Sequence, residues 1–110
     1  MSRELLGQFH HAMLGIYDAG LKLKPIYRAV YFLRMVNEYG GKEAADRLLA
    51  TGKPSKGFTD LWLRGPDALR LSVEYLVLQK PWRELFLPTQ LEVARKRLVE
   101  YGCEPPAEVV

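Results

Sequence analysis

The sequence predicts an all-α protein, a compact orthogonal or mixed helical bundle of about five to seven helices, several of them short. Apolar residues recur at three- and four-residue spacing along most of the 110-residue chain, as in helices with one buried face. Glycine and proline interrupt this pattern often, so the individual helices should be short. No stretch of the sequence combines alternating apolar and polar residues with hairpin turns, which argues against a sheet.

Three helices are predicted in the first half of the chain. The second has the widest apolar arc, so we expect it to be central, with Pro25 in its first turn. Gly40 and Gly41 separate it from the third, whose small alanines allow close packing. The predicted helices cover residues 3–19, 26–39 and 42–50.

The second half of the chain is predicted to form shorter helices and turns, which follow a polar loop at residues 51–56. Pro81 prevents two of them from forming one continuous helix. Leu87 precedes the last helix and has no side-chain acceptor, so Pro88 and Gln90 should partly replace the missing cap. The predicted segments are a helix at 57–63, a turn at 68–70, a helix at 72–78, a turn at 82–86 and a helix at 88–101.

Chain length and cysteine content favour one helical domain over residues 1–102, followed by a flexible tail at 103–110. The single cysteine, Cys103, can form no intrachain disulfide and supplies no zinc-binding cluster. It follows the last helical pattern beside a proline-rich end. We therefore expect a bystander thiol in the tail rather than a reactive one.

A carboxylate stands where the helical period places a core residue: Glu74, within the apolar run 71–78. No second carboxylate, histidine or nucleophile accompanies it at a spacing typical of catalysis. An unpaired buried carboxylate would cost several kcal/mol, so we expect a structural buried ion pair with an arginine. The predicted donors are Arg95 and Arg97 at the edges of the last helix's inner face, then Arg28 and Arg34.

The outer side of the second predicted helix carries an aromatic ridge, Tyr27 and Tyr31 with Arg34 three residues further on. Two interpretations remain open. Either another helix covers the ridge, or it is an exposed candidate interaction surface.

Composition disfavours several classes of function. The net charge is +3, and the 16 basic residues are interleaved with 13 acids, so a nucleic-acid surface is only an alternative. His10 and His11 are neighbours on a helix and point about 100° apart, so we expect no metal site. No apolar run is long enough for a membrane span and no secretory signal is present, which favours the cytoplasm. The alternative nucleic-acid surface consists of Lys22, Lys24, Lys53, Lys56 and Arg64.

Several motifs occur in one order along residues 9–102: Phe9-x-x-Ala-Met13, Tyr39-Gly-Gly, Gly57-Phe-x-x-Leu61, Ser72-Val-Glu-x-Leu-Val-Leu78, Leu85-Phe86 and Ala94-Arg-x-Arg-Leu98. In these the chain resembles a family of small, functionally uncharacterised bacterial all-helical proteins. The resemblance implies a helical module found alone or beside other domains, with no assigned activity. This chain departs from the family at Leu87, where a threonine cap is usual, and in a longer segment at 65–71.

These observations favour a non-enzymatic interaction module, which docks on a protein partner or associates with itself. The alternative is a nucleic-acid-associated accessory protein with a diffuse basic surface. We expect no catalytic residues and no cofactor, because no motif in the sequence specifies either. The low content of Asn, Gln and Cys resembles that of thermophile proteins.

Overall fold

The computed structural model describes residues 3–107, and every regular element in that range is helical, which confirms the predicted all-α class. Six α-helices and two short 3-10 helices follow one another along these residues. In chain order they are α1 (Arg3–Gly20), α2 (Val30–Tyr39), α3 (Gly41–Ala50), α4 (Lys56–Trp62), η1 (Pro66–Leu71), α5 (Val73–Val77), η2 (Trp82–Leu85) and α6 (Pro88–Glu100).

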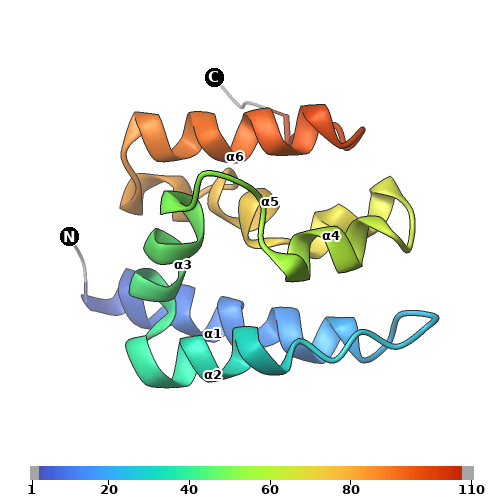
Figure 1. Cartoon of the computed structure of the whole chain (residues 1–110). Helices are drawn as coiled ribbons and strands as arrows, with labels where there is room; N and C mark the ends of the chain where they lie inside the picture. Colours follow the sequence, from blue (N-terminus) through green and yellow to red (C-terminus); the bar gives the residue numbers. More distant parts are fainter. Residues whose placement is uncertain (1–2, 108–110) are drawn as a thin grey trace.

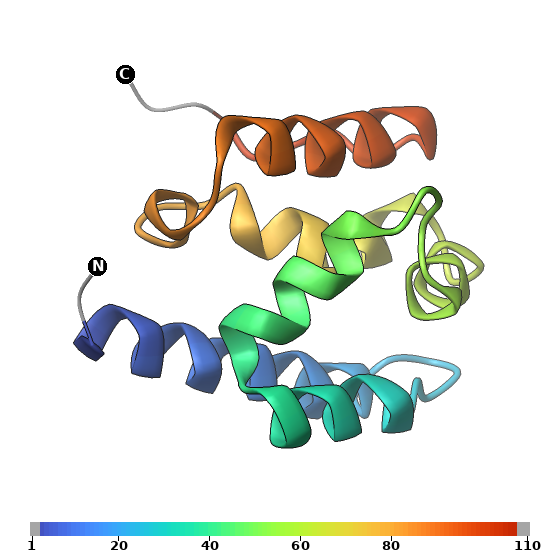
Figure 2. The same cartoon turned by 60° about the vertical axis from the view of Figure 1, so that its left-hand side comes forward.

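The helices are arranged in three tiers (Figure 1). Helices α1 and α2 lie side by side in one outer tier, and α6 forms the opposite one. The shorter elements α4, η1 and α5 lie between them. Helix α3 runs across the tiers and packs against both α1 and α6 (Figure 2). The fold is therefore a mixed bundle in which α3 joins the two outer tiers.

Helix α3 can approach its neighbours closely because its inner face is made of small residues. Ala44 and Ala45 are fully buried. A Cβ atom on Gly41 would lie 2.6 Å from the Cα atom of His10, so only glycine fits where α3 meets α1. The Gly41 backbone N–H donates a hydrogen bond to His10 Nδ1 over 2.9 Å. His10 therefore satisfies an otherwise unpaired amide at the start of α3.

Aromatic rings connect α1 to the elements around η2. The Phe9 ring is fully buried and meets the Phe86 ring edge-on, with centroids 5.4 Å apart. Trp82 lies on another side of Phe9 at 5.7 Å. These contacts place the aromatic side chains that follow Pro81 on the core. Other core side chains include Met13, Val36, Leu49, Leu69, Val77 and Leu98.

The second helix begins at Val30, four residues later than predicted, and Pro25 lies outside it. Residues 21–29 are irregular, and Tyr27 turns its ring into the core instead of onto a helix face. The Tyr27 amide donates to Gly20 O, and Arg64 donates to Pro25 O and Ile26 O. These tertiary hydrogen bonds replace the ones that a helix would have made.

Helix α6 begins with half of a capping box. Leu87 offers no acceptor, but its backbone N–H donates to Gln90 Oε1 over 2.8 Å. The same Gln90 amide donates to Asp46 on α3 over 2.9 Å. Gln90 thus partly replaces the missing cap, as predicted, and also connects α6 to α3.

Cys103, the first residue of the predicted flexible tail, is buried in the structure. Its backbone N–H donates to Leu98 O over 2.9 Å, and Gly102 makes the turn with a φ of +84°. Burial raises the pKa of the Cys103 thiol, which makes it less nucleophilic. The final residues of the predicted tail, 108–110, lie outside the described part of the chain.

Candidate functional site

Glu74 and Arg97 form a buried ion pair at the centre of the molecule. Ser72 caps α5 by accepting a hydrogen bond from the Tyr75 amide over 3.2 Å, which places Glu74 in the first helical turn. Arg97 approaches from α6, and its Nη1 donates to Glu74 Oε2 over 3.0 Å. The two residues are only 4% and 6% exposed. Each charge is therefore removed from water together with its partner.

Arg97 also binds the carboxyl end of α3. Its Nη1 donates to Leu48 O over 3.0 Å, and its Nη2 donates to the Thr51 carbonyl and hydroxyl oxygens over 2.5 and 3.2 Å. Carbonyls at the end of a helix lack partners within the helix and carry partial negative charge. One guanidinium therefore joins α3, α5 and α6.

The ion pair does not fully offset the cost of burying the carboxylate. Burial raises the pKa of Glu74 above its ordinary value of 4.5. Hydrogen bonds from its own backbone and from Arg97 oppose the rise but are smaller effects. In buried ion pairs, the free-energy cost of removing both charges from water commonly exceeds the attraction between them. Glu74 is thus an anchor between elements rather than a large source of stability.

Of the arginines predicted as partners, the structure brings Arg97 to Glu74. Arg95 points to the edge of α6, where its Nε lies 3.9 Å from Glu92 Oε2. Arg28 and Arg34 are exposed on the opposite outer tier. In the sequence, Arg95 and Arg97 both lie at the edges of the inner face of the last helix, so both were candidate partners of Glu74. Only the rotation of α6 against α5 distinguishes them.

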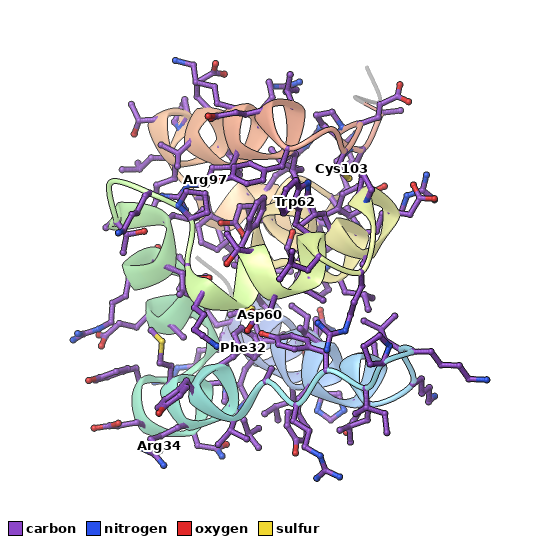
Figure 3. All side chains as sticks on the ribbon, turned by 45° about the vertical axis from the view of Figure 1, so that its right-hand side comes forward. Phe32, Arg34, Asp60, Trp62, Arg97 and Cys103 are labelled. Carbon is purple, nitrogen blue, oxygen red and sulfur yellow. The ribbon has the colours of Figure 1, made fainter. Side chains whose placement is uncertain are left out.

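A largely apolar groove of about 440 Å³ lies between α4 and the segment that leads into α2. Its depth is lined by side chains from α2, α3, α4 and α5, which include Phe32, Met35, Leu48, Phe58 and Val73. Figure 3 shows Phe32 and Asp60 near one another on the two sides of this region. The groove, formed from residues far apart in sequence, was not predicted.

Polar groups are few in the groove and most are already paired. Glu74 contributes to its inner wall and is bound by Arg97. Asp60 lies near the rim, where its Oδ2 is 3.4 Å from Lys56 Nζ. Arg28, also on the rim, is exposed. This combination of apolar depth and a few polar groups at the edge is typical of a binding site for an apolar group.

The two interpretations left open for the aromatic ridge apply to different members of it. Tyr27 is only 9% exposed, because it precedes α2 and packs under α4, where its hydroxyl lies against Gly57. Burial and the nearby Asp60 carboxylate raise the pKa of Tyr27. Tyr31 is 76% exposed, and the Arg34 guanidinium lies 5.8 Å from its ring centroid. Tyr31 and Arg34 thus remain as surface residues beside the groove.

The five residues of the alternative nucleic-acid surface divide into two kinds. Arg64 is a structural residue: it donates to three backbone carbonyls and lies 5.3 Å from the Tyr27 ring centroid. The four lysines, Lys22, Lys24, Lys53 and Lys56, are exposed. Of these lysines, Lys56 lines the groove, whereas Arg64 ties the segment before α2 to α4.

Two further classes of site receive no support from residues 3–107. No group of three or more His, Cys, Asp or Glu residues in that range is placed to hold a metal ion. Within the same range, no helix combines the length and the apolar character needed to cross a membrane.

Comparisons with known proteins add no further constraint: a scan against family models, a search of curated proteins and a search of solved structures each found no match.

Proposed function

We propose that this protein is a non-enzymatic binding module, which holds an apolar segment of a protein partner in the groove between α2 and α4. The observation that supports this proposal most directly is the groove itself, with two exposed apolar side chains at its mouth. Val30 is 49% exposed and Tyr31 is 76% exposed, and both line the groove. Bulky anchors in a desolvated pocket supply most of the affinity in such interfaces.

The shape of the groove favours an inserted side chain over a flat contact. Its lining combines aliphatic and aromatic groups from four helices, so an entering side chain would be surrounded on several sides. The volume is within the roughly 300–1,000 Å³ of ordinary ligand pockets. An amphipathic helix could insert one or two large anchors and leave its polar face in water.

A matched pair of variants tests the proposal. Val30→Glu places a charge at the groove mouth, and because Val30 is the first residue of α2, a carboxylate there is compatible with the helix dipole. Val99→Glu makes the same change at an exposed position on α6. Each protein is used to select from a displayed library of random peptides of about 16 residues.

The wild type and Val99→Glu should enrich the same peptides, rich in large apolar residues, whereas Val30→Glu should bind them at least about tenfold more weakly by calorimetry. Circular dichroism checks that all three proteins are equally helical. Failure of the wild type to enrich any apolar peptide, or equal binding by Val30→Glu, would contradict the proposal.

One observation favours nucleic acid as a second candidate, namely that the groove is lined by an exposed lysine, Lys56, and an exposed aromatic ring, Tyr31. A single-stranded oligonucleotide would then bind with steep salt dependence and stack a base on Tyr31. A gel-shift at two salt concentrations checks this. The burial of most rings in the groove supports the first candidate, since bases stack on exposed aromatic faces. Tyr31 is exposed, whereas Tyr27, Phe32 and Phe58 are buried or half-buried.

A further inference from the structure

Two segments that contribute residues to the groove are more basic than the rest of the protein, and two of their seven basic residues, Arg28 and Lys56, line the groove itself. Residues 19–37 carry four Lys or Arg and no acid, and residues 51–64 carry three basic residues and one acid. The remaining chain has nine basic and twelve acidic residues. The net charge of +3 therefore arises wholly from the two segments that enclose the groove.

The structure leaves much of this positive charge uncompensated. The carboxylates in the groove, Glu74 and Asp60, are already paired with Arg97 and Lys56. No ion pair within residues 3–107 joins a carboxylate to Arg28 or Arg34. Among the charged residues that line the groove, Arg28 is thus left without a carboxylate partner in the described part of the chain.

Arg28 and Arg34 precede and follow the two exposed apolar residues of the groove, Val30 and Tyr31, along the chain. Arg28 precedes Val30 and lines the groove itself. Arg34 follows Tyr31 by about one helical turn and borders a shallow hollow that Val30 and Glu38 also line. Figure 3 shows Arg34 at the outer edge of α2, away from Asp60. A segment that leaves the groove along the exposed side of α2 would pass Arg28 and then Arg34.

We infer that the groove takes a peptide segment of a partner protein whose large apolar anchors are flanked by Asp or Glu. This inference rests on the proposed binding function and adds the chemistry of the partner. Acidic flanks complement Arg28 and Arg34, whereas basic flanks would be repelled. Exposed charge pairs contribute only modestly to affinity, so the apolar anchors supply most of the binding free energy. The charges determine which of two peptides with the same anchors binds more tightly.

Two synthetic peptides of about 16 residues test this selection. Both carry the same leucine and phenylalanine anchors at helical spacing, and their ends carry either glutamates or lysines. Fluorescence anisotropy measures both affinities at about 50 mM and about 300 mM salt. The glutamate peptide should bind about tenfold more tightly at low salt, and the ratio should fall as salt screens the rim charges.

Charge-reversed variants show which residues cause the preference for the glutamate peptide. The double variant Arg28→Glu/Arg34→Glu should lose or invert the preference. The control Lys80→Glu/Lys96→Glu removes the same charge at two exposed positions away from the groove and should retain the preference.

Equal affinity for the two peptides, lost in Val30→Glu, would overturn the charge inference and leave the groove as the binding site. A preference unchanged by Arg28→Glu/Arg34→Glu would also overturn it. If neither peptide binds, the proposed binding function itself fails. If a single-stranded oligonucleotide of about 12 nucleotides binds more tightly than either peptide, and Val30→Glu abolishes that binding, the ligand of the groove is nucleic acid and not a peptide.

Discussion

Arg97 shows how one side chain can connect several short helices. Helix α5 has only five residues and would not be stable alone, because a short helix cannot recover the cost of its first turn. Arg97 binds Glu74 on this helix and two residues at the end of α3. A lysine could not make this set of contacts, since it lacks the planar fork of the guanidinium.

Removing Arg97 should therefore be costly. We expect Arg97→Met to lower the free energy of unfolding by about 3–5 kcal/mol, because Glu74 would be left buried without a compensating charge. The double variant Glu74→Leu/Arg97→Met should lose less than Arg97→Met alone, since no buried charge remains. Urea denaturation measures both. Arg95→Met is the control on the same helix and should cost less than about 1 kcal/mol; an equal loss for both arginines would contradict the role of Arg97.

The raised pKa of Glu74 has a consequence for stability as a function of pH. The unfolded chain loses this proton near the ordinary pKa of 4.5, and the folded protein loses it only at higher pH. Between those two values the folded state binds more protons, so stability falls as pH rises through this window. The wild type should therefore lose stability relative to Glu74→Gln as pH increases from about 4 towards 7. Urea titrations at several pH values measure the difference, and a wild type that instead gains stability relative to Glu74→Gln as pH rises would show that Arg97 outweighs burial.

At the scale of elements, the contact between α1 and α3 depends on a missing side chain. The Gly41 position lets α3 start directly against the backbone of α1, and His10 accepts the hydrogen bond of its amide. The sequence predicts Gly41 between two helices and predicts no metal-binding role for His10. Neither assignment could show that the two meet, because they are 31 residues apart.

Gly41→Ala should destabilise the protein by about 1–3 kcal/mol, because the new methyl group would force α1 and α3 apart. Gly7→Ala is the matched control. Gly7 is also helical, but nothing lies within 4 Å of the position its Cβ would occupy. That variant should gain roughly 0.5–1 kcal/mol from the better helix former. Thermal unfolding of both variants measures the contrast, and two changes of the same sign would contradict the packing argument.

For the whole molecule, the pattern of contacts predicts one cooperative unit. Helix α3 touches both outer tiers, Arg97 joins α3, α5 and α6, and the Phe9 ring connects α1 to the η2 region. No tier can separate without breaking one of these connections. The single domain predicted from chain length would then unfold as a unit.

Two tryptophans allow this prediction to be measured. Trp62 at the end of α4 lies edge-on to the Tyr101 ring at 5.6 Å, and Trp82 lies against Phe9. In Trp62→Phe and Trp82→Phe the remaining tryptophan reports on a different part of the molecule. Within each variant, fluorescence and far-UV circular dichroism should give the same midpoint of thermal unfolding. Distinct midpoints would indicate that the tiers unfold separately.

The sequence by itself determined the helical class, the approximate position of most helices and the need for a partner to Glu74. Those features follow from local periodicity, capping residues and the cost of burying a charge. Tertiary structure decided that Arg97 is the partner, that Tyr27 is buried and that α2 starts at Val30. It also decided that two basic segments enclose an apolar groove. These features depend on hydrogen bonds and packing between residues distant in the chain, such as Arg64 with Pro25, which no local pattern encodes.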